Sequence, residues 1–317
     1  MSHSLPNISS TSEIPSPTIK MESDITEGSL LSKLKEIIGK DIDSLRISIP
    51  MFLIHPESNL PFLSRLHNIE KILKSDEDKM TRFTDALSAY LAQLKNGLQK
   101  SKKPLNPILG EVYTTHFNCP DKDPVYVVAE QVSHHPPISV FTCFSKDFKT
   151  VATTMFDTKA SFTGMHFVLK NDSKAHVKKT ILINGEEVVE NYYCIFPDAN
   201  VTGIMSGSFQ MEWINHFVFW SPELGLKALI KFENGWFTKP KVQGWIYRIS
   251  NSYENDLKAS KESLKSLTKT LKSLHITGPG LEHTVDLNPE DVLYNIWGSH
   301  HDDICATTPD KSVISSN

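Results

Sequence analysis

The feature that most constrains this sequence is a long succession of short β-type segments, from Gly110 to about Ile249, with turns but no helical segment among them. The segments are rich in Val, Ile, Thr, Phe and Tyr, and turn pairs such as Asn184-Gly185 separate them. Parallel strands need long crossovers that are usually helical, so segments joined in this way predict an antiparallel arrangement. We therefore exclude a parallel α/β sheet.

The size of the predicted sheet indicates what it encloses. Its expected strands are Val112–Phe117, Val125–Gln131, Ile138–Phe144, Val151–Phe156, Ser161–Leu169, His176–Ile183, Val188–Ile195, Val201–Met205, Phe209–Trp213, Phe217–Trp220, Leu226–Phe232 and Val242–Ile249. Exposed sheet edges promote aggregation, and closure of the sheet removes them, so we expect the sheet to curl and close into a barrel. So many strands exceed what a small barrel filled by side chains needs, and a wider barrel must contain something. The sequence thus predicts a ligand cavity.

Composition excludes several classes of protein. The chain has 317 residues and a formal net charge of −4, so there is no global basic field for nucleic acid and any anion site is local. The four cysteines have no zinc-finger or CxxC spacing and favour a reducing compartment. Neither an apolar run of about eighteen residues nor a signal peptide is evident. We expect a cytoplasmic protein that meets membranes only peripherally.

The sequence divides into a Ser/Thr/Pro-rich disordered tail at 1–24, a single domain at 25–278 and a loosely ordered tail at 279–317. Within the domain we expect helices over about 60–98, the barrel over about 110–250 and a further helix over about 253–275. The last helix has a leucine stripe and a lysine stripe, so it either packs on the barrel, the commoner arrangement, or lies on a membrane surface.

A short amphipathic helix is predicted at about 27–40. Its apolar residues recur at helical spacing, with lysines on the other side, and include Leu30, Leu31, Leu34 and Ile38. Helices of this kind most often dock on the core. Alternatively, the helix covers the mouth of a cavity or touches a bilayer. A neutral apolar strip of this size is compatible with either arrangement.

Two segments carry candidate chemistry, and the first is 101–111, SKKPLNPILGE. Its two prolines make a rigid, non-helical strap that leads into the first strand and presents Lys103 and Asn106 at fixed positions. An ammonium and an amide donor on a stiff loop suit a phosphate. A turn with a solvated lysine is the commoner explanation of a Lys-Pro pair taken alone.

The second segment is 130–137, EQVSHHPP, in which His134 and His135 end a strand before two prolines. Neighbouring strand residues point to opposite faces and chelate one metal poorly, and no further His/Cys cluster completes a metal set. Twist at a strand end can still turn both rings towards one anionic ligand. Ser133 and His134 cannot form a nucleophile–base pair, and no nucleotide-binding loop occurs.

These two motifs, KPLNPILGE at 103–111 and EQVSHHPP at 130–137, resemble those of the oxysterol-binding protein family of lipid-binding and lipid-transfer domains. The likeness extends over roughly 27–250. It implies a mainly β fold with helices (α+β), in which a large incomplete antiparallel barrel surrounds an apolar tunnel under an N-terminal lid.

The resemblance also implies ligands and site residues. A sterol or another lipid would occupy the tunnel, with phosphatidylinositol 4-phosphate as an exchange ligand. Lys103 and Asn106 would contact the inositol phosphates, His134 and His135 the 4-phosphate, and Leu30, Leu31, Leu34 and Ile38 would form the lid. The late basic motif of full-length family domains has no counterpart here, since Arg248 is the last arginine. This shortening predicts a weaker phosphoinositide site.

The predicted function is therefore extraction and transfer of a membrane lipid without covalent chemistry. The alternative is a lipid sensor or scaffold that does not transfer its ligand. An enzyme is disfavoured because no nucleophile–base pair or metal set can be assembled, and no cofactor is expected. The expected partners are a sterol or phospholipid, phosphatidylinositol 4-phosphate and, transiently, a membrane surface, with no nucleic acid.

Overall fold

A computed structural model describes residues 38, 54–64, 72, 78–97, 103–119, 123–203, 210–235, 238–249, 292–298, 304–307 and 313–316. These residues form a mainly β fold with two helices among them, and the predicted fold class is confirmed. The helices are α2 (Asn59–Ser64) and α3 (Lys79–Gly97), and the first strands are β1 (Ile54–Ser58), β2 (Lys103–Leu105) and β3 (Val112–Phe117). The remaining strands are β4 (Val125–His134), β5 (Pro137–Ser145), β6 (Thr150–Phe162), β7 (Phe167–Asn171), β8 (Lys174–Ile183), β9 (Glu186–Ile195), β10 (Asp198–Thr202), β11 (Gln210–Ser221), β12 (Leu226–Gly235), β13 (Thr238–Arg248), β14 (Val292–Gly298), β15 (Ile304–Thr307) and β16 (Val313–Ser316).

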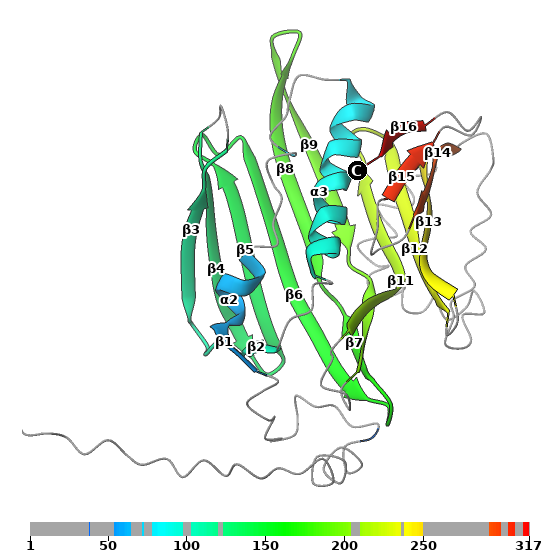
Figure 1. Ribbon diagram of the computed structural model, residues 1–317. Coiled ribbons are helices and arrows are strands. Elements are labelled where there is room, and N and C mark those ends of the chain that lie inside the picture. The colour runs from blue at the N-terminus through cyan, green and yellow to red at the C-terminus, as the bar shows by residue number, and fades with distance from the viewer. Residues whose placement is uncertain are drawn as a thin grey trace, which may run out of the picture.

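Fourteen of these strands form one antiparallel sheet, in which β3 to β6 are successive neighbours. Two long strands each pair with two partners on one side. The first part of β6 pairs with β8 and its last part with β7, while β11 pairs first with β10 and then with β9. Among the described strands, β3 and β16 end the pairing order, so the barrel is incomplete (Figure 1).

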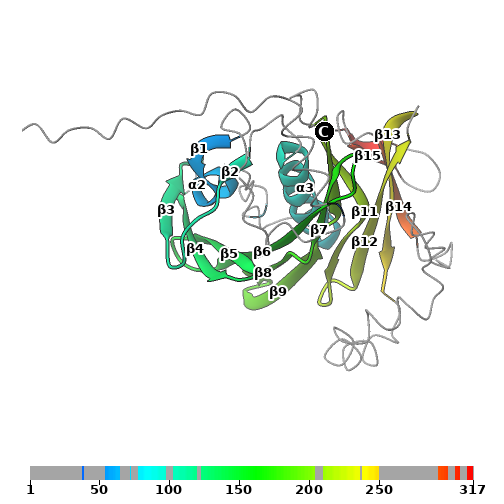
Figure 2. The ribbon, with the colours of Figure 1, turned by 90° about the horizontal axis from the view of Figure 1, so that it is seen from below.

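The sheet is strongly curved, and α2 and α3 lie on its concave side (Figure 2). Burial along the strands follows from this curvature. In β4 the residues Val125, Val127, Ala129 and Gln131 are buried and their neighbours are exposed. Alternation of this kind is what a strand with one packed face and one solvated face requires.

Two apolar clusters lie on the concave side. The larger one forms between α3, through Phe83, Leu87, Tyr90 and Leu94, and the strands beneath it. These helical residues share one face because they recur at three- and four-residue steps. The smaller cluster lies under α2 and is built on Leu60, Ala129 and Phe141, with Leu63, Tyr113 and Phe156 packed against it.

The start of α3 is fixed by Asp78. Its carboxylate accepts hydrogen bonds from the backbone N–H groups of Met80 and Thr81, at 2.8 and 3.4 Å, and from the Thr81 hydroxyl at 2.5 Å. These bonds satisfy backbone donors that have no partner within the helix. They also hold the pKa of Asp78 below its ordinary value, with the Thr81 hydroxyl as the largest cause.

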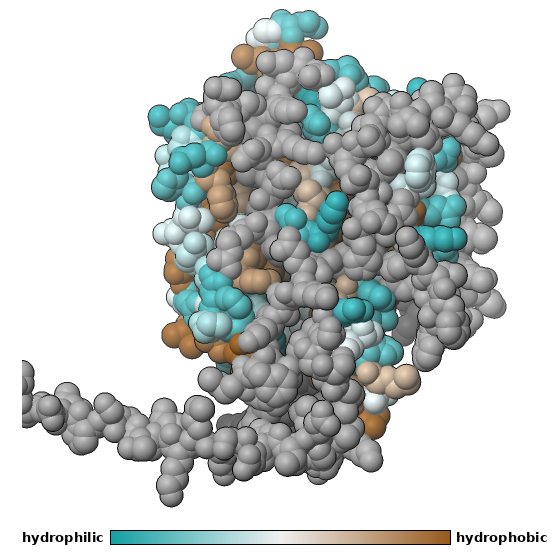
Figure 3. Space-filling view, in the orientation of Figure 1, coloured by the Kyte–Doolittle hydropathy of each residue, from teal (hydrophilic) through white to brown (hydrophobic). Residues whose placement is uncertain are grey.

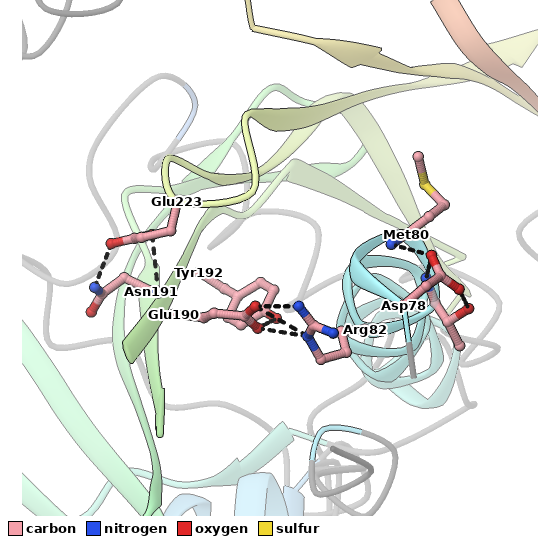
Figure 4. Close-up of polar contacts among 8 residues, drawn as sticks. Asp78, Met80, Arg82, Glu190, Asn191, Tyr192 and Glu223 are labelled. Atoms are coloured by element: carbon pink, nitrogen blue, oxygen red, sulfur yellow. Dashed lines mark hydrogen bonds and ion pairs between the residues drawn. The ribbon is translucent and has the colours of Figure 1, made fainter. Parts of the chain in front are cut away.

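A buried ion pair attaches α3 to β9 (Figure 4). The guanidinium of Arg82 donates to the carboxylate of Glu190, with Nη2 at 2.7 Å from Oε1 and Nε at 3.1 Å from both oxygens. The hydroxyl of Tyr192 donates to the same carboxylate at 2.6 Å. Burial, followed by this hydrogen bond, raises the pKa of Tyr192, and the bond to Glu190 raises that of Arg82. Both charges are therefore paired inside the fold.

The structure differs from the predicted organisation in several places. The segment Ser161–Leu169 was expected as one strand but is divided between the end of β6 and the start of β7. The segments Phe209–Trp213 and Phe217–Trp220 were expected as separate strands, but residues 210–213 and 217–220 belong to one strand, β11, in which Asn215 has a φ of 69°. The expectation of a loosely ordered 279–317 is wrong at 292–298, where β14 pairs with β13 over Val242–Tyr247. Two further strands extend this pairing: β15 pairs with β14 and β16 pairs with β15, which satisfies their backbone hydrogen-bonding groups.

Several predicted segments lie outside the described residues. They are the tail at 1–24, most of the helix predicted at 27–40 and the helix predicted at 253–275. Of the predicted lid residues, Leu30, Leu31 and Leu34 also lie outside. Ile38 is described, and it forms a single parallel bridge with Phe162, at the end of β6, rather than part of a helix.

Candidate functional site

The strap that the sequence predicted before the first barrel strand is extended. Its residues Lys103–Leu105 form β2, which pairs in parallel with β1. The Nζ of Lys103 donates to Oδ1 of Asn106 at 2.7 Å and to the carbonyl oxygen of Pro104 at 3.3 Å. The structure thus brings the two predicted strap residues together. Oδ1 of Asn106 accepts from the ammonium of Lys103, so the N–H groups of the Asn106 amide can donate to an anion.

Glu111 fixes the end of the strap. Its backbone N–H donates to the carbonyl oxygen of Ile108 at 3.0 Å, closing a turn in which Gly110 has a φ of 78°, as a type II turn requires. Its carboxylate accepts a hydrogen bond from the N–H of Ile108 at 3.1 Å and another from the hydroxyl of Ser58 at 2.5 Å. Since Ser58 ends β1, one side chain joins the turn to β1.

The two predicted histidines lie at the tip of the β4–β5 hairpin. His134 ends β4 and pairs with Pro137, and His135 and Pro136 make the connection. The two imidazole rings are in contact, with centroids 4.7 Å apart and planes at 60°. Both side chains are exposed. The rings therefore lie together and open to solvent, where one ligand can reach both.

Gln131 connects the hairpin to the strap. Its side chain is buried, with Nε2 donating to the carbonyl oxygen of Ser133 at 2.6 Å and Oε1 accepting from the hydroxyl of Ser139. Its backbone accepts from the N–H of Gly110 at 2.9 Å and donates to the carbonyl oxygen of Glu111 at 3.1 Å. The strap and the histidine hairpin are thus held by adjacent backbones at one end of the sheet.

Glu111 and Gln131 are positioning residues whose roles sequence reasoning missed, although both stand in the two motifs. The role of Gln131 could have been predicted from the alternation of inward and outward residues in β4. This alternation places its amide on the buried face, where an amide needs hydrogen-bond partners. For Glu111 it was a carboxylate directly after a glycine turn. The identity of their partners, however, depends on segments distant in the sequence.

The described residues also include a separate cavity of about 400 Å³. It is lined by parts of α3, β13, β14 and the β11–β12 turn, including Lys79 and Arg248, and by no residue of the strap or the histidine hairpin. Within the described part of the chain, no group of three or more His, Cys, Asp or Glu side chains is arranged to hold a metal ion. No described helix has the length and apolarity that a membrane span requires.

Comparison with known proteins agrees with this fold. Residues 29–286 match the family described as "Oxysterol-binding protein". The chain is 29% identical over 266 residues to the oxysterol-binding protein-like protein OBPalpha of Candida albicans, covering 81% of this chain and 57% of that protein. It is 25% identical over 254 residues to oxysterol-binding protein homolog 6 of Saccharomyces cerevisiae, covering 79% and 54%. The chain thus spans little more than half the length of these relatives.

Solved structures share the fold. The Osh1 ORD domain in complex with ergosterol superposes with a TM-score of 0.62 at 22% identity, over 90% of this chain and 58% of that one. The Osh3 ORD of Saccharomyces cerevisiae in complex with PI(4)P superposes with a TM-score of 0.57 at 18% identity, over 91% and 65%. The family is one of lipid-binding proteins and not of enzymes, as the sequence predicted. The chain belongs to the oxysterol-binding protein family.

Proposed function

We propose that this protein binds a sterol or another membrane lipid in the interior of its curved sheet and exchanges it for phosphatidylinositol 4-phosphate. The observation that carries the proposal is the joining of two phosphate-suited pairs, Lys103 with Asn106 and His134 with His135, at one end of the sheet. Structural neighbours of this chain were solved with ergosterol, with cholesterol and with PI(4)P.

The headgroup would be held by the strap and the hairpin. Lys103 and the Asn106 amide would donate to the inositol phosphates, and His134 and His135 to the 4-phosphate. Each charge-assisted hydrogen bond contributes about 1.5–3 kcal/mol, so the loss of two shifts the affinity at least about tenfold. Glu111 and Gln131 would act indirectly, by keeping these donors in fixed positions at little ordering cost.

The apolar part of the ligand would lie on the concave side, between the cluster under α2 and the cluster under α3. Burying about 400 Å² of apolar lipid surface at about 25 cal/mol per Å² stabilises the complex by about 10 kcal/mol before ordering costs. This is enough to compete with a bilayer and still release the lipid. We assign the lid to Leu30, Leu31, Leu34 and Ile38.

Mutual exclusion of the two ligands would make the exchange directional. A protein carrying one lipid would load the other only after releasing the first, so two membranes of different composition would drive net transport. We place this activity in the cytoplasm, with transient contact at membrane surfaces. A sensor that binds lipid without moving it is the competing function.

A transfer assay between two vesicle populations tests this proposal. Donor vesicles contain a fluorescent sterol and acceptor vesicles contain phosphatidylinositol 4-phosphate, and transport is followed in both directions. We expect His134→Ala with His135→Ala to reduce phosphoinositide extraction at least about tenfold while sterol uptake stays within about twofold. Lys103→Ala should act in the same direction.

Exposed residues far from the site provide the control. Lys146→Ala with Lys149→Ala removes two exposed cations from the β5–β6 turn and should leave both activities unchanged. Equal loss of sterol and phosphoinositide extraction in the histidine variant would remove the headgroup assignment. Binding of both lipids without transport in the unmodified protein would favour the sensor.

A further inference from the structure

One end of the sheet carries large apolar side chains in a tight turn, where small and polar residues are usual. In the turn closed by Glu111, Ile108 is 71% exposed and Leu109 is 62% exposed. Val112 and Val132 beside it, on β3 and β4, are exposed as well. We call these four apolar residues the strap-turn cluster. Figure 3 shows hydrophobic side chains at the lower left of the described surface, the end at which β1 and β2 lie in Figure 1.

The strap-turn cluster is held in place rather than loosely exposed. The carboxylate of Glu111 binds the backbone of Ile108 and the hydroxyl of Ser58, so the turn is tied to β1. The positive φ of Gly110 fixes the path of the chain immediately after Leu109. The backbone therefore keeps Ile108 and Leu109 in solvent, although burying each of them would be favourable.

A second apolar tip lies at the same end of the sheet. Strand β6 pairs Asp157 with Ile138, next to the histidine hairpin, and then continues beyond the hairpin to Phe162. The turn that follows contains Met165, which is 67% exposed. Ile38, which bridges Phe162, is also exposed. This end thus carries two separate apolar protrusions.

Cations accompany these apolar tips. Lys159 and Lys170 are exposed and lie directly opposite one another on β6 and β7. Like charges in such a pair are destabilising, and within the described part of the chain neither lysine has an ion-pair partner. Lys103 adds a positive charge at the strap. Three carboxylates lie at the same end: Glu111 in the strap turn, Glu130 opposite Val112 and Asp157 opposite Ile138. The cations are therefore concentrated at the Lys159–Lys170 pair rather than spread over this end of the sheet.

We propose that this end of the sheet docks on an anionic bilayer, with Ile108 and Leu109 entering the interfacial region and Lys159 and Lys170 contacting lipid phosphates. The inference rests on the proposed function, because it brings the headgroup residues to the membrane that contains their ligand. Rigid apolar tips with cations between them suit a bilayer, since each tip can enter the interface while the lysines remain at the headgroups.

The apolar part of the proposal is tested by flotation with vesicles of phosphatidylcholine containing phosphatidylserine. We expect Ile108→Ser with Leu109→Ser to lower the bound fraction of the full chain by about tenfold or more, because two inserted side chains lose their transfer energy. The matched control is Leu182→Ser with Ile183→Ser, at the tip of the β8–β9 hairpin, where Leu182 is 61% exposed. This control should bind as the unmodified protein does. Equal binding by the strap-turn variant, or equal loss in both variants, overturns the proposal.

The charged part is tested with the same vesicles at several salt concentrations. Lys159→Gln with Lys170→Gln should lose the share of binding that depends on phosphatidylserine, and the loss should vanish in high salt, where the attraction is screened. Lys146→Gln with Lys149→Gln, at the β5–β6 turn, is the matched control and should retain that share. A salt-independent effect, or an equal effect in the control, contradicts the assigned role of the lysines.

A soluble short-chain ligand separates this inference from the proposed function. The strap-turn variant should bind dioctanoyl phosphatidylinositol 4-phosphate in solution within about twofold of the unmodified protein. If it loses this ligand as well, the cluster belongs to the ligand site and the docking assignment is wrong. If the unmodified protein does not bind the soluble ligand but the strap-turn variant loses vesicle binding, the docking surface is upheld and the proposed function fails.

Discussion

The backbone N–H of Gln131 donates to the carbonyl oxygen of Glu111 at 3.1 Å, so two positioning residues are neighbours at the candidate site, one directly before β3 and the other on β4. One side chain, the Glu111 carboxylate, holds the turn of the strap, and the other, the Gln131 amide, holds the base of the histidine hairpin. Through this pair the structure connects Lys103 and Asn106 to His134 and His135. Neither member of the pair needs to contact the ligand.

We predict that Glu111→Ala weakens phosphoinositide binding about tenfold, because the strap then loses two bonds that preorganise it. Ser58→Ala removes only one of these bonds and should have a smaller effect. Titration with dioctanoyl phosphatidylinositol 4-phosphate measures both, and sterol binding serves as the control. Unchanged affinity in Glu111→Ala would show that the strap does not need this carboxylate.

The ion pair between Arg82 and Glu190 predicts a non-additive effect on stability. Arg82→Met leaves the Glu190 carboxylate buried without its cation and should cost about 3–5 kcal/mol of unfolding free energy. Arg82→Met with Glu190→Met removes both charges and should cost less than the single variant. Urea denaturation measures each value. If the loss of unfolding free energy in the double variant equals the sum of the losses in Arg82→Met and in Glu190→Met, the two charges do not interact as the structure indicates.

The cap of α3 predicts a pH dependence in acid. The pKa of Asp78 is lowered in the folded state, so its stabilising contribution is present above its unfolded pKa and is lost as the pH falls through the folded value. Asp78→Ala should cost about 1 kcal/mol near neutral pH. Asp78→Asn keeps a capping oxygen and should cost less, with a weaker dependence on pH. Thermal melts from about pH 2 to about pH 7, a range that covers ordinary carboxyl pKa values, check this. Identical pH profiles for all three proteins would contradict it.

Buried thiols predict slow chemical modification. Burial raises the pKa of Cys143 to about 12 and that of Cys194 well above its ordinary value. At pH 8 about one Cys143 thiol in ten thousand is then ionised, and only the thiolate reacts. We expect iodoacetamide to label both residues slowly in the native protein and rapidly in urea, as peptide mass mapping would show. Equally fast labelling in both conditions would place these cysteines at the surface.

The architecture was predictable where local sequence decides it. The strand expected at Val112–Phe117 has those bounds in the structure, and the apolar face of α3 follows from its helical spacing. Two strands were expected within β11 because Asn215 and His216 interrupt its apolar pattern. In the structure Asn215 takes a positive φ within the strand, a conformation that asparagine tolerates better than most residues.

Long-range pairing was not predictable in this way. The segment Val292–Gly298 becomes a strand through its pairing with β13, after a gap of more than forty residues in the sequence. In the candidate site, the motifs identified the strap and the histidines, but not the bonds from Glu111 to Ser58 or from Gln131 to Ser139. Each of these bonds depends on how a strand end meets another segment, which a local pattern does not contain.

Native mass spectrometry of the purified chain with its lipids tests the central claim most directly. We predict one lipid per chain, a sterol or a phospholipid, which added phosphatidylinositol 4-phosphate displaces one for one. His134→Ala with His135→Ala should retain the first lipid and resist displacement. A complex that holds both lipids at once, or a chain that binds neither, would contradict the account.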